Sequence, residues 1–295
     1  MGVYLVSQLL NGLIFGLIYC LIALGLTVVF SIMRVINFAH GEFFMLGGYA
    51  LYLFTVPLGL PPIVGLPLSM ATVCAFGVLV ERSLLRPIYT TRMERPEEYA
   101  IILTFGLALF LQNAALWSLG AYEYTPMSFW EGSKHVFGDL YLSGDRLFAA
   151  GMAALLIAAT LLIVYRTWLG HALMAASQSQ VGASVVGISV VRMNAVAMGL
   201  AGMLAAAAGS LLGPIFLIYP DVGTVPVIKA FVIIVLGGMG SIPGAVIAAI
   251  LLGVIESLGS IYISVAYRDV YSFLVLILVL VVRPHGIFGQ RERRA

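Results

Sequence analysis

Leu9-Leu-Asn-Gly-Leu-Ile-Phe-Gly-Leu-Ile-Tyr-Cys-Leu-Ile-Ala-Leu-Gly-Leu-Thr-Val-Val-Phe30 is a predominantly apolar run near the start of the chain, and it contains no charged residue. A helix needs about 20 such residues to cross the hydrocarbon core of a bilayer, and this run is long enough. The residues before it include no Lys or Arg, so the basic leader of a secretory signal peptide is missing. We therefore interpret the run as a retained first membrane helix.

The composition of the whole chain agrees with this interpretation. Hydrophobic residues make up 62% of the 295 residues and charged residues only 9%, whereas a soluble domain carries about 25% charged residues. Lipid must therefore face much of the surface. The net charge of +2 gives no sign of a nucleic-acid partner. Cys20 and Cys74 stand alone in apolar runs without a CxxC motif, so we predict packing roles and no disulfide or metal site.

Further apolar runs follow along the chain and set the expected architecture. They lie near 8–30, 41–56, 62–81, 100–119, 147–165, 193–213, 227–238, 243–258 and 270–283. The run at 227–238 is short, and polar residues interrupt the chain before the run at 41–56, so broken helices are expected at both places. We predict an all-α fold: a polytopic transmembrane helix bundle with about eight or nine membrane segments, some of them broken, in a single transmembrane domain over residues 1–295.

The basic residues predict the orientation of this bundle, because cytoplasmic loops are enriched in Lys and Arg. With the N-terminus outside and 227–238 crossing, eleven basic residues fall on the cytoplasmic side and four on the outer side. The cytoplasmic set is Arg34, Arg82, Arg86, Arg92, Arg95, Arg166, Arg192, Arg283, Arg291, Arg293 and Arg294, and the outer set is Lys134, Arg146, Lys229 and Arg268. The C-terminus is then cytoplasmic.

Small residues recur at every fourth position in three places, which is typical of close helix contacts within lipid. The rows are Ala197, Ala201, Ala205, Gly209 and Gly213; Ala245, Ala249 and Gly253; and Gly12, Gly16 and Cys20. We expect them to pack the bundle, with use as a subunit interface as the alternative.

Motifs for chemistry are missing from the sequence. There is no GxxxxGK[ST] loop, so the chain has no such site for ATP, and transport driven by ATP would need another subunit to bind it. The four histidines are scattered, and neither an HExxH motif nor a Ser-His-Asp arrangement can be recognised. We predict no catalytic residue, no metal and no cofactor bound by this chain.

The segment from Arg34 to Tyr49 is the first polar interruption of an apolar run. Asn37 is suited to cap the following helix, and Glu42 lies near that helix start, where a negative charge is favourable. Arg34 is a possible partner for Glu42, because a carboxylate near the membrane boundary must be solvated or paired. The segment is either a capped turn or a broken helix that lines a water-filled path.

The segment Leu236-Gly-Gly-Met-Gly-Ser-Ile-Pro-Gly244 is the second interruption. Ser241 can cap the next helix, with Pro243 in its first turn. A tight hairpin and a break that lines a cavity are both compatible with this composition. Within the fourth apolar run, Gln112 and Asn113 indicate hydrogen bonding between helices or pore lining.

We predict that the stretches 37–42 and 237–244 lie near one another and border a translocation path. The residues predicted for this path are Asn37, His40, Glu42, Gln112, Asn113, Gly238, Gly240 and Ser241.

Two connecting segments remain. The segment from Arg166 to Arg192 is mildly amphipathic and cytoplasmic by the charge count, so a short helix is expected there, either on the membrane surface or in a groove of a partner. The outer segment 120–146 holds aromatic and acidic residues, which we interpret as an interfacial belt and a solvated loop, with a docking surface for an external partner as the alternative.

Three stretches of the chain resemble the bacterial ABC permeases for branched-chain amino acids, and specifically the smaller of their two permease subunits. These stretches are Gly25-Leu-Thr27 through Val35-Ile-Asn37-Phe-Ala-His40-Gly41-Glu42 to Gly47-Gly48-Tyr49; Leu236-Gly-Gly-Met-Gly-Ser-Ile-Pro-Gly-Ala245 with Leu252-Gly-Val-Ile-Glu256; and Val282-Arg-Pro284-His-Gly286-Ile-Phe-Gly289.

The resemblance implies a set of partners and a location. Members of this family work in the inner membrane with a second homologous permease, two cytoplasmic ATP-binding subunits and a periplasmic or surface solute-binding protein. It also implies that the segment 166–192 couples to the ATPase. Met174-Ala175-Ala176 falls near the family's Glu-Ala-Ala signature, with Met in place of Glu. The predicted coupling residues are His171, Met174, Ala175, Ala176, Gln180, Gly182 and Gly187.

The resemblance favours leucine, isoleucine and valine as cargo. Permeases of the same family for urea, short amides or other amino acids are the alternative, although the urea and short-amide permeases tend to have an N-terminal extension. An ion-coupled secondary transporter is the rival from another class, with Glu42, Glu81 and Glu256 as its candidate coupling acids.

Overall fold

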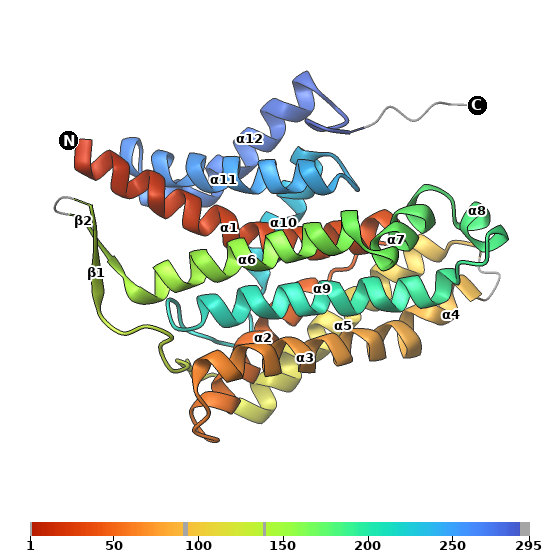
Figure 1. Cartoon of the computed structure of the whole chain (residues 1–295), viewed down its shortest axis with the longest axis horizontal. Helices are drawn as coiled ribbons and strands as arrows, with labels where there is room; N and C mark the ends of the chain where they lie inside the picture. Colours follow the sequence, from red (N-terminus) through yellow and green to blue (C-terminus); the bar gives the residue numbers. More distant parts are fainter. Residues whose placement is uncertain (1, 91–93, 138–139, 290–295) are drawn as a thin grey trace.

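The computed structural model describes residues 2–90, 94–137 and 140–289, and it confirms an all-α membrane bundle. The longer helices, among them α6, α9 and α11, run along the long dimension of the molecule (Figure 1). They are α1 (Gly2–Met33), α2 (His40–Thr55), α3 (Pro62–Val80), α4 (Arg86–Thr90), α5 (Pro96–Leu119), α6 (Gly144–Arg166), α7 (Trp168–Gln178), α8 (Gln180–Val185), α9 (Val190–Leu212), α10 (Thr224–Gly237), α11 (Ile242–Tyr262) and α12 (Arg268–Val282). A π-helical turn, Glu81–Leu85, joins α3 to α4, and a 3₁₀ turn, Val265–Tyr267, precedes α12.

The number of membrane segments matches the expectation. Within the described residues, seven helices are long and apolar enough to cross a membrane, and α10 is a shorter apolar helix. The 16-residue α2 adds a second short element. Eight or nine segments with broken helices are therefore confirmed.

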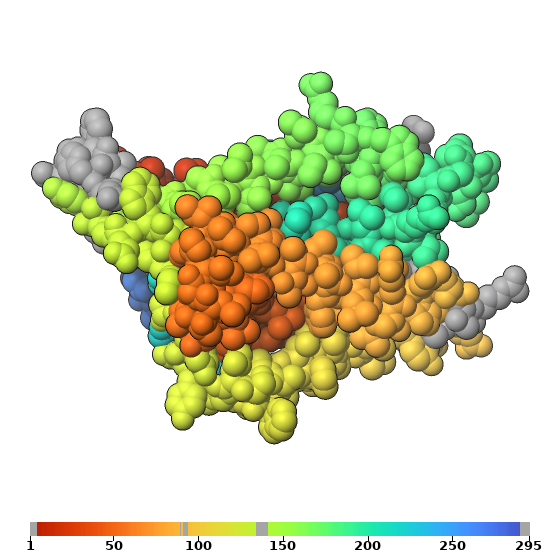
Figure 2. Space-filling model, turned by 60° about the horizontal axis from the view of Figure 1, so that its bottom comes forward, coloured from red at the N-terminus to blue at the C-terminus, as the bar shows by residue number. Residues whose placement is uncertain are grey.

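Two helices form the centre of the bundle. In α9, 89% of the most apolar window is buried inside the chain, and α1 is almost as enclosed, whereas the corresponding value for α12 is 11%. A space-filling view shows α9 only within the furrow between α6 and α3 (Figure 2). The surfaces of α5, α6 and α12 are thus available to lipid or to another subunit.

Small residues bring α1 into close contact with α11 and with α9, as the fourfold rows predict. Gly12 packs on Gly253, where an added Cβ would lie 2.9 Å from a carbonyl oxygen, and Gly25 packs on Ala201 at the same distance. The Ser257 hydroxyl, one turn beyond Gly253, donates to the carbonyl of Gln8. The residue numbers of these contacts rise along α1 and fall along α11, so the two helices are antiparallel. The small residues of these rows therefore pack helices of the same chain against one another.

The chain reverses after α1 without completing a second full helix. Arg34 has a φ of 52°, which turns the backbone sharply, and residues 34–39 return along α1. His40, the first residue of α2, lies beside Ile22, since its Nε2 is 3.0 Å from that carbonyl oxygen. The helix α2 therefore begins roughly 16 Å before the end of α1, which confirms the broken helix.

The same arrangement occurs at α10. The chain leaves α9, turns back through residues 213–223 and starts α10 where Gly223 packs against the backbone of Gly41. At its other end, α10 meets the hairpin to α11, and Gly240 lies against Ser31 near the end of α1. Residues 213–223 therefore return part of the way across the bundle, and α10 covers the rest of the distance.

The hairpin between α10 and α11 is held by the end of the chain. The backbone N–H groups of Ile287 and Phe288 donate to the carbonyls of Leu236 and Gly237, at 2.9 and 3.0 Å. Two of the three stretches that carry the family resemblance therefore meet in space.

A small β-hairpin at one end of the bundle was not expected. It pairs β1 (Ser133–Phe137) with β2 (Leu140–Ser143). Asp145, which we had interpreted as part of a solvated loop, instead accepts hydrogen bonds from the Ser128 hydroxyl and from the N–H groups of Phe129 and Trp130. Asp139, from the same predicted loop, lies outside the described residues.

The two ends of the bundle differ in what they carry. The β-hairpin lies at the end where the chain starts, and α7 and α8 lie at the other end, toward which α12 runs (Figure 1). Among the residues of the predicted outer set, Lys229 is buried within α10 and Arg268 starts α12. Their positive charges belong to an internal ion-pair cluster, described next.

Candidate transport site

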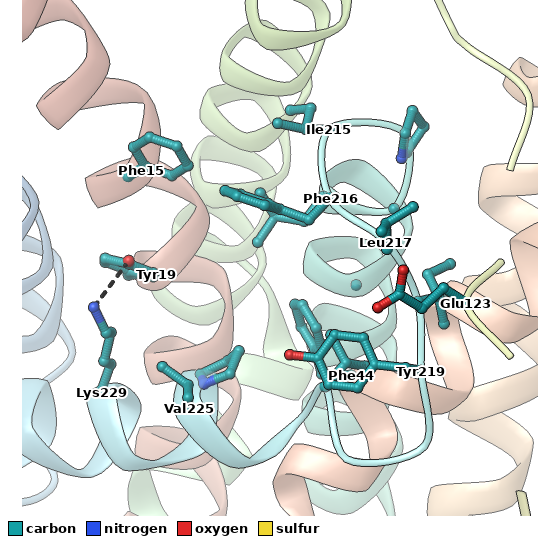
Figure 3. A pocket seen from close by; sticks show the side chains of 18 of the residues that line it. Phe15, Tyr19, Phe44, Glu123, Ile215, Phe216, Leu217, Tyr219, Val225 and Lys229 are labelled. Carbon is teal, nitrogen blue, oxygen red and sulfur yellow. Dashed lines mark hydrogen bonds between the residues drawn. The ribbon is translucent and has the colours of Figure 1, made fainter. Parts of the chain in front are cut away.

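A cavity of about 630 Å³ lies in the end of the bundle that carries the β-hairpin. Its wall combines α1, α2, the loop that follows α9, and the first turns of α10 and α12 (Figure 3). The volume falls within the roughly 300–1,000 Å³ that pockets for small molecules occupy. The site therefore has room for a small solute.

Four charged side chains meet at one side of this cavity and balance one another. Lys229 Nζ lies 2.7 and 2.8 Å from the two carboxylate oxygens of Glu256, and 3.1 Å from Asp269 Oδ1. Arg268 Nε donates to Glu256 at 3.2 Å. The side chains of Lys229 and Glu256 are 6% and 0% exposed. An ion pair this deep is sustained only when further hydrogen bonds satisfy both partners.

Two hydroxyl groups supply those further bonds. The Tyr19 hydroxyl donates to Glu256 Oε2 and accepts from Lys229 Nζ, both at 3.3 Å. The Ser272 hydroxyl donates to Glu256 Oε1. This charge cluster, comprising Tyr19, Lys229, Glu256, Arg268, Asp269 and Ser272, ties α1, α10, α11 and α12 together.

Only part of the cluster faces the cavity. Lys229, Arg268 and Asp269 line it, whereas Glu256 lies behind them. Arg268 and Asp269 are each anchored through one atom, and the described residues supply no hydrogen-bond partner to the terminal amino groups of Arg268 or to Asp269 Oδ2. These groups are therefore available to a bound solute.

The remaining wall is mainly aromatic and aliphatic. The rings of Phe15 and Phe216 lie 5.9 Å apart between centroids, and the Arg268 guanidinium lies 4.7 Å from the centre of the Phe15 ring. Figure 3 shows Glu123 and Tyr219 on the side away from Lys229. Such a surface suits an apolar group next to a charged one.

Chemistry on the solute finds no support in this arrangement. Among the described residues, no three His, Cys, Asp or Glu side chains gather in a way that could hold a metal ion. The free thiols of Cys20 and Cys74 do not line the cavity. The geometry favours reversible binding and passage.

The predicted path residues at the start of α2 are deeply buried. Asn37 and His40 are fully inaccessible, and Glu42 is 5% exposed. Asn37 is not the helix cap: α2 is preceded by Ala39, and the Asn37 side chain accepts a hydrogen bond from the Ala39 N–H at 3.0 Å and donates to Met198 Sδ at 3.7 Å.

The expected pairing of Arg34 with Glu42 is wrong. Arg34 is exposed near the end of α1, while Glu42 lies in the first turn of α2. Glu42 Oε2 is buried without a hydrogen-bond partner among the described residues, and so is His40 Nδ1. The backbone turn at Arg34 carries the two charges apart.

The second interrupted segment is a hairpin with the expected cap. The Ser241 hydroxyl accepts from the Gly244 N–H at 3.2 Å, and Pro243 lies in the first turn of α11. Gly238 and Gly240 have φ values of 101° and 84°, a conformation that side chains disfavour. The glycines of this segment are therefore required by the turn.

The two interrupted segments are not neighbours, contrary to the prediction. The Phe38 ring lies 5.4 Å from the ring of Phe231 in the middle of α10, and Gly41 packs on Gly223 at the start of that helix, whereas residues 237–244 follow its end. The length of the 14-residue helix therefore separates Gly41 from Gly237 by about 21 Å. Gln112 and Asn113 lie apart from both, on α5, where Asn113 bonds its own helix at Leu109. None of the eight predicted path residues lines the cavity, and their role in a path stays a prediction.

The predicted coupling residues form two short helices at the opposite end from the cavity. In α7, Ala172, Leu173 and Ala176 face the bundle, whereas His171 is exposed. Gln180 starts α8 and donates to the Ile32 carbonyl of α1 at 2.9 Å. The amphipathic pattern therefore predicted a real helix. Gly182 is exposed in α8, and Gly187 follows it with a φ of 85°. Met174 and Ala175 are half-buried in α7.

Sequence reasoning missed the charge cluster and the cavity. It counted Lys229 among the basic residues of the outer side and treated Glu256 only as a possible coupling acid. The available signal was one Lys and one Glu of opposite sign in neighbouring apolar runs, since charges inside a membrane pair with each other. Phe15, Tyr19, Phe216, Arg268 and Asp269 gave no signal of their own.

A polytopic helix bundle with broken helices is the architecture typical of membrane transport proteins. The chain belongs to the family described as branched-chain amino acid transport system / permease component, which it matches over residues 8–280. The sequence resemblance is thereby confirmed, and the chain is a multi-pass membrane permease component.

Named relatives match nearly the whole chain. The high-affinity branched-chain amino acid transport system permease protein BraD of Pseudomonas aeruginosa is 35% identical, over 97% of this chain and 96% of its own length. The permease protein LivH of Escherichia coli K12 is 34% identical over 98% and 97%. The permease protein LivM of Salmonella typhimurium is 27% identical over 92% of this chain and 68% of its own length. No solved structure matches the chain.

Proposed function

We propose that this chain is a membrane-spanning permease subunit of a binding-protein-dependent ABC importer for leucine, isoleucine and valine. The observation that carries the proposal is the similarity to permeases named for branched-chain amino acid transport, at 34–35% identity over almost the full length. Urea or a short amide is the alternative cargo within the same family.

The chain works with partner subunits in this proposal. A second homologous permease of the LivM kind completes the membrane part. Two permeases from one family share a fold, so the two subunits can pack against each other as a pair. Two cytoplasmic ATPases bind the ATP, since this sequence has no P-loop, and a solute-binding protein delivers the cargo from outside.

The proposal includes an orientation of the bundle in the membrane. The chain lies in the inner membrane of a bacterium with the β-hairpin end and the N-terminus outside, and with α7, α8 and the C-terminus in the cytoplasm. The Lys and Arg count supports this direction. The bias is stronger when Lys229 and Arg268, which are both paired with Glu256, are left out of the outer set.

The proposed ATPase contact is the α7–α8 surface. Val181, Val185 and Val186 are 76%, 80% and 73% exposed there, although α7 buries its small residues against the bundle. Three exposed valines on a segment between two membrane helices suit a groove of a partner subunit. A docked α8 would transmit movement through the Gln180 contact to α1.

Uptake by the assembled importer tests the proposed cargo. Proteoliposomes with this chain, its three partner subunits and the solute-binding protein should accumulate leucine when ATP is supplied, and omitting this chain should abolish uptake. Accumulation of urea or acetamide, without leucine, would select the alternative.

The purified chain alone should neither bind nor hydrolyse ATP, because the nucleotide site is on other subunits. Hydrolysis and binding of a labelled nucleotide are measured on a preparation free of the ATPases, with the full complex as the positive control. Activity that persists in the partner-free sample would contradict the division of labour.

Substitution of Val181 tests the coupling surface. Val181→Glu should lower leucine uptake at least ~10-fold by opposing burial of the helix in the partner, while the permease still inserts. The control is Leu58→Glu, which adds the same charge at a 64% exposed position between α2 and α3. Equal uptake by both variants would exclude this surface from coupling.

A further inference from the structure

We propose that the cavity beside the charge cluster binds a zwitterionic amino acid with an aliphatic side chain, so that this subunit itself recognises the cargo. The inference rests on the proposed function for the class of solute. It adds a site within one permease chain, with named residues for each part of the solute.

Adjacent side chains at the start of α12 present the two charges that a zwitterion needs. Arg268 uses Nε to hold Glu256, which leaves its terminal amino groups to donate two parallel hydrogen bonds to a carboxylate. Asp269 uses Oδ1 to meet Lys229, which leaves Oδ2 to accept from an ammonium group. Both residues line the cavity.

The buried pair behind them prevents a competing internal bond. Glu256 holds the Arg268 side chain through Nε, and Lys229 holds the Asp269 carboxylate, so the neighbouring Arg and Asp do not neutralise each other directly. Because the four charges sum to zero, a zwitterion adds no net charge to the site. Binding therefore avoids the cost of leaving a buried charge without compensation.

The apolar wall fits the side chain of such a solute. Phe15 lies beneath the Arg268 guanidinium, Phe216 packs beside Phe15, and Val225 from α10 also lines the cavity. A solute whose carboxylate meets Arg268 would place its side chain against these groups. Charged solutes without an apolar part would leave this wall in contact with water.

The site should be weak, which suits passage. Arg268 is 29% exposed and Asp269 is 64% exposed, so water competes for both charges. The cavity also exceeds what one amino acid fills, so the solute shares it with water.

Saturation-transfer NMR on the complete complex in nanodiscs, without the solute-binding protein, tests the site. The probes are leucine, leucinamide, which lacks the carboxylate, and 4-methylpentanoate, which lacks the ammonium. Leucine methyl groups should receive saturation, and both analogues should bind at least ~5-fold more weakly, because each loses one charge-assisted bond. Equal signals from leucine and 4-methylpentanoate would overturn the proposal, since they would show apolar partition alone.

Two variants locate the signal. Val225→Trp should remove it by filling the cavity, and Ile228→Trp should keep it. These positions are matched, since both lie on α10 with 49% and 41% exposure, but Ile228 does not line the cavity. Asp269→Asn, a substitution of similar size, should reduce the preference for leucine over 4-methylpentanoate to about one. An unchanged signal in Val225→Trp would place binding elsewhere.

Uptake distinguishes failure of this inference from failure of the proposed function. A wild-type importer that accumulates leucine, with no cavity-dependent NMR signal, would overturn only the binding site. An importer that never accumulates leucine would overturn the proposed function.

Discussion

Glu256 and Glu42 both bring a carboxyl group into the apolar body of the bundle, but their surroundings differ. Glu256 is completely buried and contacts Lys229, Arg268, Tyr19 and Ser272. Glu42 is nearly as buried, yet its Oε2 has no hydrogen-bond partner among the described residues. One carboxyl is fully compensated by the protein, and the other is not.

This difference suggests a structural role for Glu256 and a role in transport for Glu42. Removing one member of a buried ion pair leaves an uncompensated charge, which costs several kcal/mol, so the bundle depends on Glu256. Glu42 lies in the first turn of α2, where the helix dipole favours a negative charge without a fixed partner. A group in that position can interact with a passing solute without holding the fold together.

The largest expected effect is at the compensated carboxyl. Glu256→Gln should destabilise the chain by about 3–5 kcal/mol, because Lys229 and Arg268 then face only Asp269. Thermal unfolding in detergent, followed by fluorescence, measures the loss.

A paired substitution is the control for this experiment. Lys229→Met with Glu256→Met removes both charges and leaves Arg268 and Asp269 in balance, so the double variant should be more stable than Glu256→Gln. If the double variant proves less stable than the single one, charge compensation is not what the cluster provides.

A single hydrogen bond within the cluster should have an intermediate effect. Ser272→Ala removes a donor to Glu256 and should cost about 1.5–3 kcal/mol, the range for hydrogen bonds to charged groups. Ser260→Ala is the matched control, because the Ser260 hydroxyl donates only to the backbone carbonyl of Glu256, and it should change stability much less. Equal melting shifts in the two variants would mean that Glu256 does not need this donor.

Much of the fold could be predicted from local patterns. The run at Leu9–Phe30, the small-residue rows and the Ser241 cap depend on residues close in sequence, and each is present in the structure. The interrupted segment before α2 was recognised for the same reason, although the direction of the returning chain depends on the positive φ of Arg34, which its residue type does not suggest.

The site could not be predicted because its parts are distant in sequence. Lys229 and Glu256 belong to different apolar runs, and only the antiparallel packing of α10 and α11 brings them together. The cavity joins Phe15 to residues that follow α9, a contact that no periodicity encodes. Both interrupted segments break an apolar run, yet Gly41 of the first packs at the start of α10 and the second follows the end of that helix.

The smallest effect on stability is expected at Glu42, the uncompensated carboxyl. This substitution is also the sharpest test of the comparison between Glu42 and Glu256. Glu42→Gln keeps the size of the side chain and removes its charge, so it should cost under about 1 kcal/mol, because only the interaction with the start of α2 is lost. Leucine uptake should nevertheless slow severalfold at unchanged expression if the charge meets the solute during passage. Glu98→Gln is the control, since Glu98 is an exposed acid at the start of α5 that pairs with the exposed Arg95, and its loss should alter neither property. A melting shift for Glu42→Gln as large as that for Glu256→Gln would show that both carboxyls serve the fold. Normal stability with normal uptake would leave Glu42 without a role in transport, and the translocation path would then have to be sought along the cavity and the charge cluster alone.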